Sequence, residues 1–180
     1  MFEEQYKFRG KHADMVNRLK GTFSLSSETG NIIKNHSIFD NNYQIYELAP
    51  IIGFLYNRKA TVDKDNANTS NIMAGEMIKY SDSFEFSYKL IMLLDKNNEP
   101  NAEKRIEKAF RGIDNKDDEA LFDNYLLGGV EVLHEKIFDK VNTTEDIINK
   151  LYDFLEEFND RYNDDIDMER VLELARKSAL

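Results

Sequence analysis

The histidines are the side chains best suited to chemistry in this sequence, which has three histidines and no cysteine. His134 and Glu135 begin an H-E-x-x-H zinc motif, but the fifth position is Phe138, so the second ligand is missing. No local histidine–aspartate cluster or His-x-His pair accompanies His12 or His36. Without cysteine, disulfides, thiol nucleophiles and cysteine-based metal sites are excluded. We therefore expect neither a metal nor a cofactor.

Other patterns of common catalytic sites are also absent. There is no G-x-x-x-x-G-K-[ST] or G-x-G-x-x-G phosphate loop and no G-x-S-x-G nucleophile turn. Acid pairs such as Asp117-Asp118 lack histidines nearby and are typical of solvated helix ends. The stretch from Asp160 to Asp167 lacks the central glycine and final glutamate of a calcium loop. We expect no catalytic residue within any motif, although an active site assembled by the fold stays open.

Five basic side chains could contact phosphate, as in nucleic-acid binding. They are Arg9, Lys11, Arg18, Arg58 and Lys59. The alternative, a solvated surface, is more common for bases scattered along a chain, and the net charge of −10 repels DNA. The net charge is +2 over residues 1–36, −3 over 37–100 and −9 over 101–180. Ten acids and two bases lie between Glu145 and Glu169, so an acidic DNA mimic is a further alternative.

The adjacent glycines Gly128 and Gly129 fall inside a segment with a helical apolar stripe. Two glycines in a helix cost about 2 kcal/mol relative to alanines. Such a pair indicates that another backbone approaches closely. That backbone belongs either to the chain's own core, which is the commoner case, or to a partner.

The elements that carry these residues are expected to be helices. Apolar residues recur at helical spacing over Asn41–Tyr56, Glu119–Lys140 and from Thr143 onward, where Thr143 and Asp146 form an approximate capping box. Further short helices are expected at Phe8–Leu19, Ile72–Tyr80, Ala102–Phe110 and Asp165–Lys177. The composition, with eight Gly and two Pro, also favours helix. We predict an all-α, compact helical domain of about six to eight helices.

The less regular segments leave several questions open. Pro50 predicts a kink in the second helix or its division into two, and Pro100 suits the first position of a helix. Phe84–Asp95 alternates like a strand at first, although its length and neighbours favour a buried helix. The polar stretches Thr22–Asn35 and Thr61–Asn71 are predicted loops, with a weak alternative of a short strand at 23–25.

The organisation of the chain is expected to be a helical core, residues 1–140, followed by an acidic pair of helices, residues 141–180, packed on it. No apolar run approaches the roughly 20 residues of a membrane span, and the charged N-terminus shows no secretory signal. We therefore expect a cytoplasmic protein without membrane contact. The oligomeric state cannot be predicted.

Two motifs between Tyr43 and Phe138 carry a family likeness: ELAPIIG at 47–53 followed by Asn57-Arg58-Lys59, and YLLGGVEVL at 125–133. They resemble small accessory proteins found beside DNA-phosphorothioation (Dnd-type) genes in bacterial anti-phage islands. That family has an AA-x-x-G helix followed by bases, then a Y-x-x-G-G-x-E-x-L helix. The sequence departs from it at Pro50, where alanine is usual, at 100–118, which looks like an insertion, and after Thr143.

The resemblance implies association with machinery that senses or cuts foreign DNA, and it implies no catalytic residues. We therefore expect a non-catalytic accessory subunit that docks onto a larger DNA-handling protein of a defence system, with DNA contacted, if at all, through that partner. The residues expected to face the partner or to be critical for the fold are Tyr125, Gly128, Gly129 and Glu131. Direct DNA binding and DNA mimicry are the alternatives.

Overall fold

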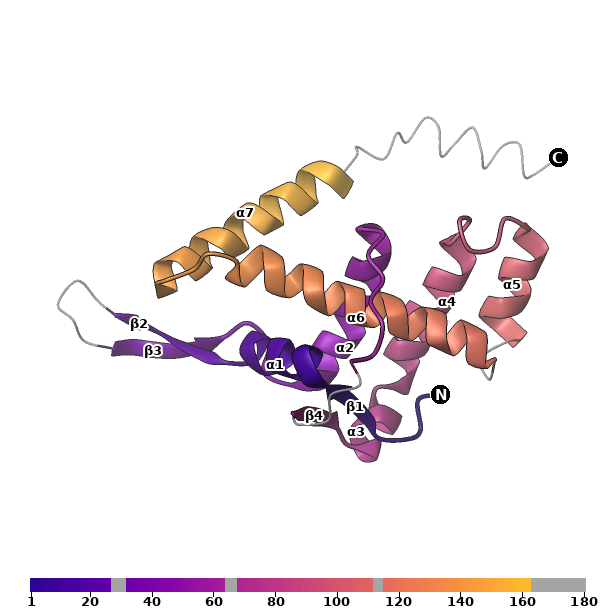
Figure 1. The fold of residues 1–180 in the computed structure, drawn as a ribbon, viewed down its shortest axis with the longest axis horizontal. Coiled ribbons are helices and arrows are strands. Elements are labelled where there is room, and N and C mark those ends of the chain that lie inside the picture. The colour runs from indigo at the N-terminus through magenta and orange to yellow at the C-terminus, as the bar shows by residue number, and fades with distance from the viewer. Residues whose placement is uncertain (27–31, 64–67, 112–114, 163–180) are drawn as a thin grey trace. The chain divides into compact units, whose positions relative to one another are not determined.

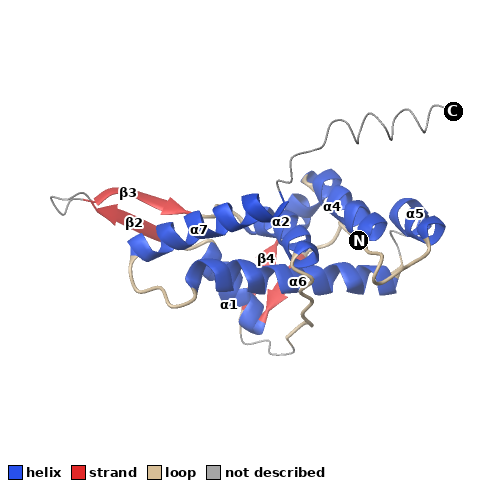
Figure 2. Cartoon of the chain, turned by 90° about the horizontal axis from the view of Figure 1, so that it is seen from above, coloured by secondary structure: helices blue, strands red, loops and turns tan. Residues whose placement is uncertain are grey.

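Helices make up most of the described chain in the computed structural model, which describes residues 1–26, 32–63, 68–111 and 115–162 (Figures 1 and 2). The helices are α1 Gly10–Leu19, α2 Asn42–Leu55, α3 Ala74–Lys79, α4 Ser81–Leu94, α5 Ala102–Arg111, α6 Lys116–Phe138 and α7 Thr144–Tyr162. The strands are β1 Tyr6–Arg9, β2 Thr22–Ser26, β3 Ile32–Ser37 and β4 Thr69–Ile72. The predicted helical fold class is confirmed, with two small sheets added.

The contacts within the chain divide it into two compact units, residues 1–135 and 136–180. The division falls inside α6, a few residues before the boundary predicted at 140. The first unit contains both sheets, α1 to α5 and most of α6. The described part of the second unit contains the end of α6 and α7.

The two sheets correct the sequence predictions of loops. β1 pairs antiparallel with β4, and Tyr6 lies opposite Ile72, so the loop predicted for Thr61–Asn71 is wrong from Thr69 onward. β2 pairs antiparallel with β3, which contradicts the loop predicted for Thr22–Asn35 and agrees with the weaker alternative of a strand at 23–25. β1 and β4 have only four residues each, and their pairing partners lie 60 or more residues apart. Such strands leave little local signal in the sequence.

The helix predictions hold for most segments. Phe84–Asp95, which was ambiguous, lies in α4 because Phe84 and Tyr88, four residues apart, share its buried face. Pro50 does not divide α2, which runs continuously through it at the loss of one backbone hydrogen bond. Pro100 lies two residues before α5 rather than at its first position.

The core of the first unit is a cluster of aromatic rings from the N-terminal segment, α2, α4 and α6. Phe2, Tyr46, Phe84, Tyr88 and Phe122 are all at most 6% exposed. The ring centroids of Tyr46 and Phe84 are 4.7 Å apart, and those of Tyr88 and Phe122 are 5.7 Å apart. Tilted and edge-on contacts of this kind stabilise beyond simple area burial. The cluster fixes α2 against α4 and α6, and these helices carry the candidate sites.

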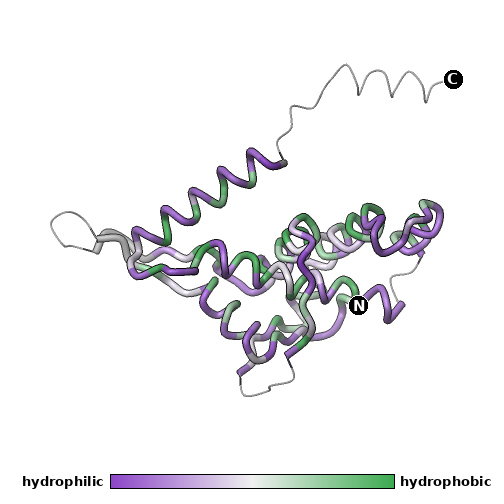
Figure 3. Tube along the Cα trace, turned by 45° about the horizontal axis from the view of Figure 1, so that its top comes forward, coloured by the Kyte–Doolittle hydropathy of each residue, from purple (hydrophilic) through white to green (hydrophobic). Residues whose placement is uncertain are grey.

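Helix α7 of the second unit begins with the predicted capping box. The amide of Asp146 donates to the Thr143 hydroxyl at 3.1 Å, and Thr143 N donates to the Asp146 carboxylate at 2.8 Å. Along α7 apolar and polar residues alternate (Figure 3). Phe154 is buried, whereas Leu155 is 58% exposed. The helix predicted at Asp165–Lys177 lies outside the described residues.

Candidate functional site

The glycine pair of α6 lies against α2. A Cβ on Gly129 would lie 1.7 Å from the carbonyl oxygen of Ala49, and a Cβ on Gly128 would lie 2.1 Å from that of Arg58. A Cβ on Gly53 of α2 would likewise lie 2.0 Å from the carbonyl oxygen of Tyr125. All three glycines are buried. The close backbone approach that the pair indicated is thus made within the chain's own core.

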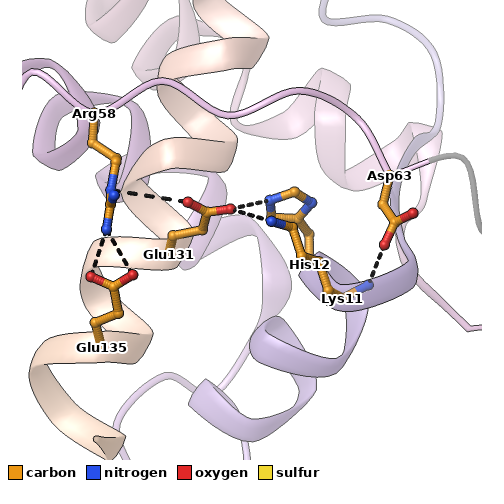
Figure 4. Close-up of polar contacts among 6 residues, drawn as sticks. All are labelled: Lys11, His12, Arg58, Asp63, Glu131 and Glu135. Carbon is orange, nitrogen blue, oxygen red and sulfur yellow. Dashed lines mark hydrogen bonds and ion pairs between the residues drawn. The ribbon is translucent and has the colours of Figure 1, made fainter.

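This crossing of α2 and α6 brings several predicted site residues into one charged network (Figure 4). One carboxylate oxygen of Glu131 accepts hydrogen bonds from Lys11 Nζ at 2.7 Å and from His12 Nε2 at 3.2 Å. Its other oxygen lies 4.0 Å from Arg58 Nε. Arg58 also donates to both carboxylate oxygens of Glu135 at 2.7 Å. Glu131 therefore ties α1 and the segment after α2 to α6.

The side chain of Glu131 is only 12% exposed. This burial affects the pKa values of the groups in the network. Burial raises the pKa of Glu131, but the hydrogen bonds from Lys11 and His12 and the charge of Lys11 outweigh it, so the net pKa is lowered. Burial lowers the pKa of His12 despite the neighbouring carboxylate. The neutral ring donates through Nε2, which leaves Nδ1 a buried acceptor without a partner among the described residues.

Tyr125 and Lys59 belong to a second, adjoining contact. The Tyr125 hydroxyl donates to the Asp95 carboxylate at 2.7 Å, and Lys59 Nζ lies 4.6 Å from the centre of the Tyr125 ring. Lys59 is also 4.0 Å from Asp95. Burial and the Asp95 carboxylate raise the pKa of Tyr125. With 1% exposure, Tyr125 lies in the core rather than on an accessible surface.

The five bases predicted to contact phosphate do not present five unpaired charges. Lys11, Arg58 and Lys59 each lie within 4.0 Å of a carboxylate. Arg9 and Arg18 are exposed on β1 and α1, and each makes further interactions of its own. Because paired bases offer less charge to phosphate, the arrangement adds no support to direct DNA binding.

The network meets solvent on one side. An open cavity of about 670 Å³ borders it and is lined by Lys11, Lys59, Asp63 and Glu131, among others. His12 is fully buried and is not among the residues that line the cavity. No group of three or more metal-ligating side chains occurs within the described ranges. The chemistry that remains is charge pairing, which positions α1 and α6.

Glu131→Gln is expected to lower the free energy of unfolding by about 1–2 kcal/mol, because it leaves a partly buried hydrogen-bonded charge pair incomplete. Glu135→Gln, one helical turn later, is the matched control: its pair with Arg58 is about half exposed, and such surface pairs contribute less than about 1 kcal/mol. Urea unfolding at neutral pH measures both. Equal losses for the two variants would contradict a special role for Glu131.

A groove between α2 and α4 is lined by exposed apolar side chains of the first unit. Its volume is about 730 Å³. Its lining includes the apolar side chains of Leu48, Ile51 and Phe86, and Phe86 is 64% exposed. Glu47 and Asp82 add negative charge to the lining. Exposed aromatic side chains of this kind are enriched at protein interfaces.

Sequence reasoning did not identify the groove residues, although one signal pointed to them. Phe84, Phe86 and Tyr88 alternate, and on a helix successive residues are separated by about 100°. If Phe84 and Tyr88 face the core, Phe86 must face away from it. The alternation therefore predicts an exposed aromatic once the segment is known to be helical.

Comparison with known proteins found no matching family model, curated protein or solved structure. The resemblance to Dnd-associated accessory proteins therefore stays a prediction. None of the helices in the described ranges combines the length and apolar character needed to cross a membrane.

Proposed function

We propose that this protein is a non-catalytic interaction module that docks a helix of a larger protein in the α2–α4 groove. The exposure of Phe86 in the wall of an apolar groove carries the proposal. A large apolar side chain in water is unfavourable, and burying it against a partner recovers that free energy. No catalytic motif competes with this interpretation in the sequence, and the charged network around Glu131 is engaged in internal pairing.

The chemistry of the groove selects the kind of partner. Its apolar side chains suit apolar residues spaced along one face of a helix, as in helix-in-groove recognition. Its lining also contains Glu47 and Asp82, which complement lysine or arginine beside those apolar anchors. The proposed ligand is therefore a basic amphipathic helix. Proteins that handle DNA are rich in basic segments, and the resemblance to defence-island accessory proteins makes such a protein the proposed partner.

The test is co-expression with the products of the flanking genes, followed by co-purification and a titration of the purified pair. Phe86→Asp is expected to weaken binding at least about 30-fold, or about 2 kcal/mol, as loss of a central aromatic anchor does. Its stability is expected to change by less than about 0.5 kcal/mol because Phe86 is exposed.

Phe110→Asp is the matched control, because Phe110 is exposed to a similar degree, 59%, but lies on α5 and does not line the groove. It is expected to bind like the wild type. Equal weakening by both variants would indicate nonspecific binding through exposed apolar side chains rather than docking in the groove. A wild-type protein that binds none of the flanking gene products would contradict the proposal.

A further inference from the structure

A second cavity, on a different part of the first unit, is lined by carboxylates and phenols. Its volume is about 380 Å³, and it lies between the N-terminal segment, β1, α2 and α6. Glu3 and Glu4 stand at the N-terminal segment, Glu119 and Asp123 on α6, and Tyr6 and Tyr46 supply aromatic rings. None of these residues lines the α2–α4 groove.

The negative charge of this cavity is only partly compensated, because Met1 also lines the cavity and its α-ammonium forms no ion pair within the described residues. No ion pair in the described part of the chain involves Glu3, Glu4, Glu119 or Asp123. Burial raises the pKa of Asp123 to about 6, and the charge of Glu119 adds to the effect against the hydrogen bond from Tyr6. Half-buried acids are normally paired, because an unpaired charge away from water is costly. Glu119 and Asp123 are half-buried, whereas Glu3 and Glu4 are exposed. Two half-buried acids around one cavity, with two exposed acids beside them, therefore favour a bound cation.

Tyr46 gives an independent sign of a missing ligand. It lines the cavity, although the residue as a whole is only 1% exposed. Its ring packs against Tyr6 and Phe84 at 4.8 and 4.7 Å, and its pKa is raised by burial and by the charges of Asp123 and Glu119. Within the described residues the Tyr46 hydroxyl makes no hydrogen bond. Buried phenols usually find a partner, so this hydroxyl is available to a ligand.

The arrangement of the carboxylates around the cavity favours an organic cation over a metal ion. No set of three acids in the described ranges converges closely enough to hold a metal. Separated carboxylates instead suit a ligand with more than one positive group. The rings of Tyr6 and Tyr46 suit the methylenes between those groups, and an aromatic face also attracts ammonium.

We propose that this cavity binds alkylammonium groups carried on a flexible aliphatic chain, as in a polyamine or in neighbouring lysine side chains. Ammonium groups would donate to Asp123, Glu119 and the Tyr46 hydroxyl, with Glu3 and Glu4 at the opening. This site is independent of the proposed docking function, since it uses other residues and another class of ligand.

The experiment is isothermal titration calorimetry of the full chain with spermidine and, separately, with an acetylated trilysine amide. A salt concentration of about 50 mM is used, because attraction between charges is only weakly screened there. Saturable binding of one ligand per chain is expected. Stronger binding of spermidine identifies a free polyamine as the source of the ammonium groups, and stronger binding of trilysine identifies a protein segment. Magnesium chloride at the same ionic strength is expected not to produce saturable binding.

Two variants test the location. The double variant Glu119→Gln/Asp123→Asn is expected to weaken binding at least about tenfold, because charge-assisted hydrogen bonds are lost. Tyr46→Phe removes only the hydroxyl and is expected to weaken binding about threefold to tenfold, since a hydrogen bond from ammonium to a neutral hydroxyl contributes less than one to a carboxylate. The unliganded Tyr46→Phe protein should unfold like the wild type, because no hydrogen bond of that hydroxyl is lost.

The matched control is Glu103→Gln/Asp153→Asn, which changes the net charge equally at exposed positions of α5 and α7. It is expected to change binding less than about twofold, as screened surface charges do. Equal weakening by both double variants would show diffuse attraction to an acidic chain and overturn the proposal. Absence of saturable binding by either ligand would also overturn it, whatever the result for the α2–α4 groove.

Discussion

Gly129→Ala is expected to destabilise the first unit by about 3 kcal/mol or more, at or beyond the upper end of the usual cost of overpacking. The added Cβ would lie 1.7 Å from the carbonyl oxygen of Ala49 and 2.9 Å from the amide nitrogen of Gly53. Both are backbone atoms of α2, so no side-chain rotation relieves the clash. The two helices would have to move apart, and the aromatic core between them and α4 would lose contacts.

Gly75→Ala is the control for the helix propensity of the substitution. Gly75 lies inside α3, and a Cβ there would meet nothing within 4 Å. The variant is expected to be stabilised by up to about 1 kcal/mol, because alanine restricts the unfolded chain and favours helix. Urea unfolding followed by circular dichroism measures both variants. A Gly129→Ala protein as stable as the wild type would show that α2 and α6 do not pack this closely.

The glycine pair shows which part of the helix packing could be predicted from the sequence alone. Two adjacent glycines in an apolar helical stripe indicated a close backbone approach, and the approach is present. The sequence did not indicate which backbone approaches, because Ala49 and Gly53 lie about 80 residues earlier and no local pattern connects them to α6. Tertiary proximity of this kind depends on how the helices cross, which periodicity does not specify.

The helices could be predicted from local patterns, whereas the strands depend on pairing between distant residues. Caps and apolar stripes are local, so the capping box at Thr143 could be inferred from a few residues. The strand β4, with the sequence TSNI, is polar enough to be interpreted as a loop. Its pairing with β1 stabilises it, and that pairing is long-range information.

The candidate sites were only partly predictable. Lys11, Arg58 and Glu131 were singled out as separate features, a basic patch and a partner-facing helix, yet the fold joins them in one network. Opposite charges far apart in the sequence can neutralise one another, and a count of bases does not reveal this. The α2–α4 groove and the acidic cavity were missed because each is formed by several elements whose packing the sequence does not fix.

The stability of this protein is expected to depend on pH through Asp123. Its folded pKa of about 6 exceeds the value of about 3.9 in unfolded chains. A group whose pKa is raised by folding stabilises the folded state while it is protonated. This contribution is fully present below about pH 4 and is lost as the pH rises through 6, and the difference amounts to about 2–3 kcal/mol.

Asp123→Asn removes this titration and retains an oxygen that can accept the hydrogen bond of the Tyr6 hydroxyl. The variant is therefore expected to gain stability over the wild type between pH 4 and pH 7, by about 2–3 kcal/mol across that range. Comparing the two proteins at each pH matters because Glu131 has a lowered pKa. Groups of that kind lose stability as the pH falls, the opposite trend, and the comparison cancels their contribution.

Two further variants isolate the cause. Glu119→Gln removes the neighbouring charge that helps to raise the pKa of Asp123, so the pH dependence is expected to shift to lower pH without disappearing. Asp153→Asn, at an exposed position of α7, reports the general effect of removing one negative charge. Urea unfolding at half-unit pH intervals gives the free energies, and NMR titration of the Asp123 side-chain carboxyl gives its pKa directly. Two results would show that the acidic cavity does not raise the pKa of Asp123. One is an Asp123 titration midpoint near pH 4, and the other is a stability difference between wild type and Asp123→Asn that is the same at pH 4 and pH 7. Because the same unpaired charge is what a cation would neutralise, the titration also measures how strongly the unliganded cavity favours one.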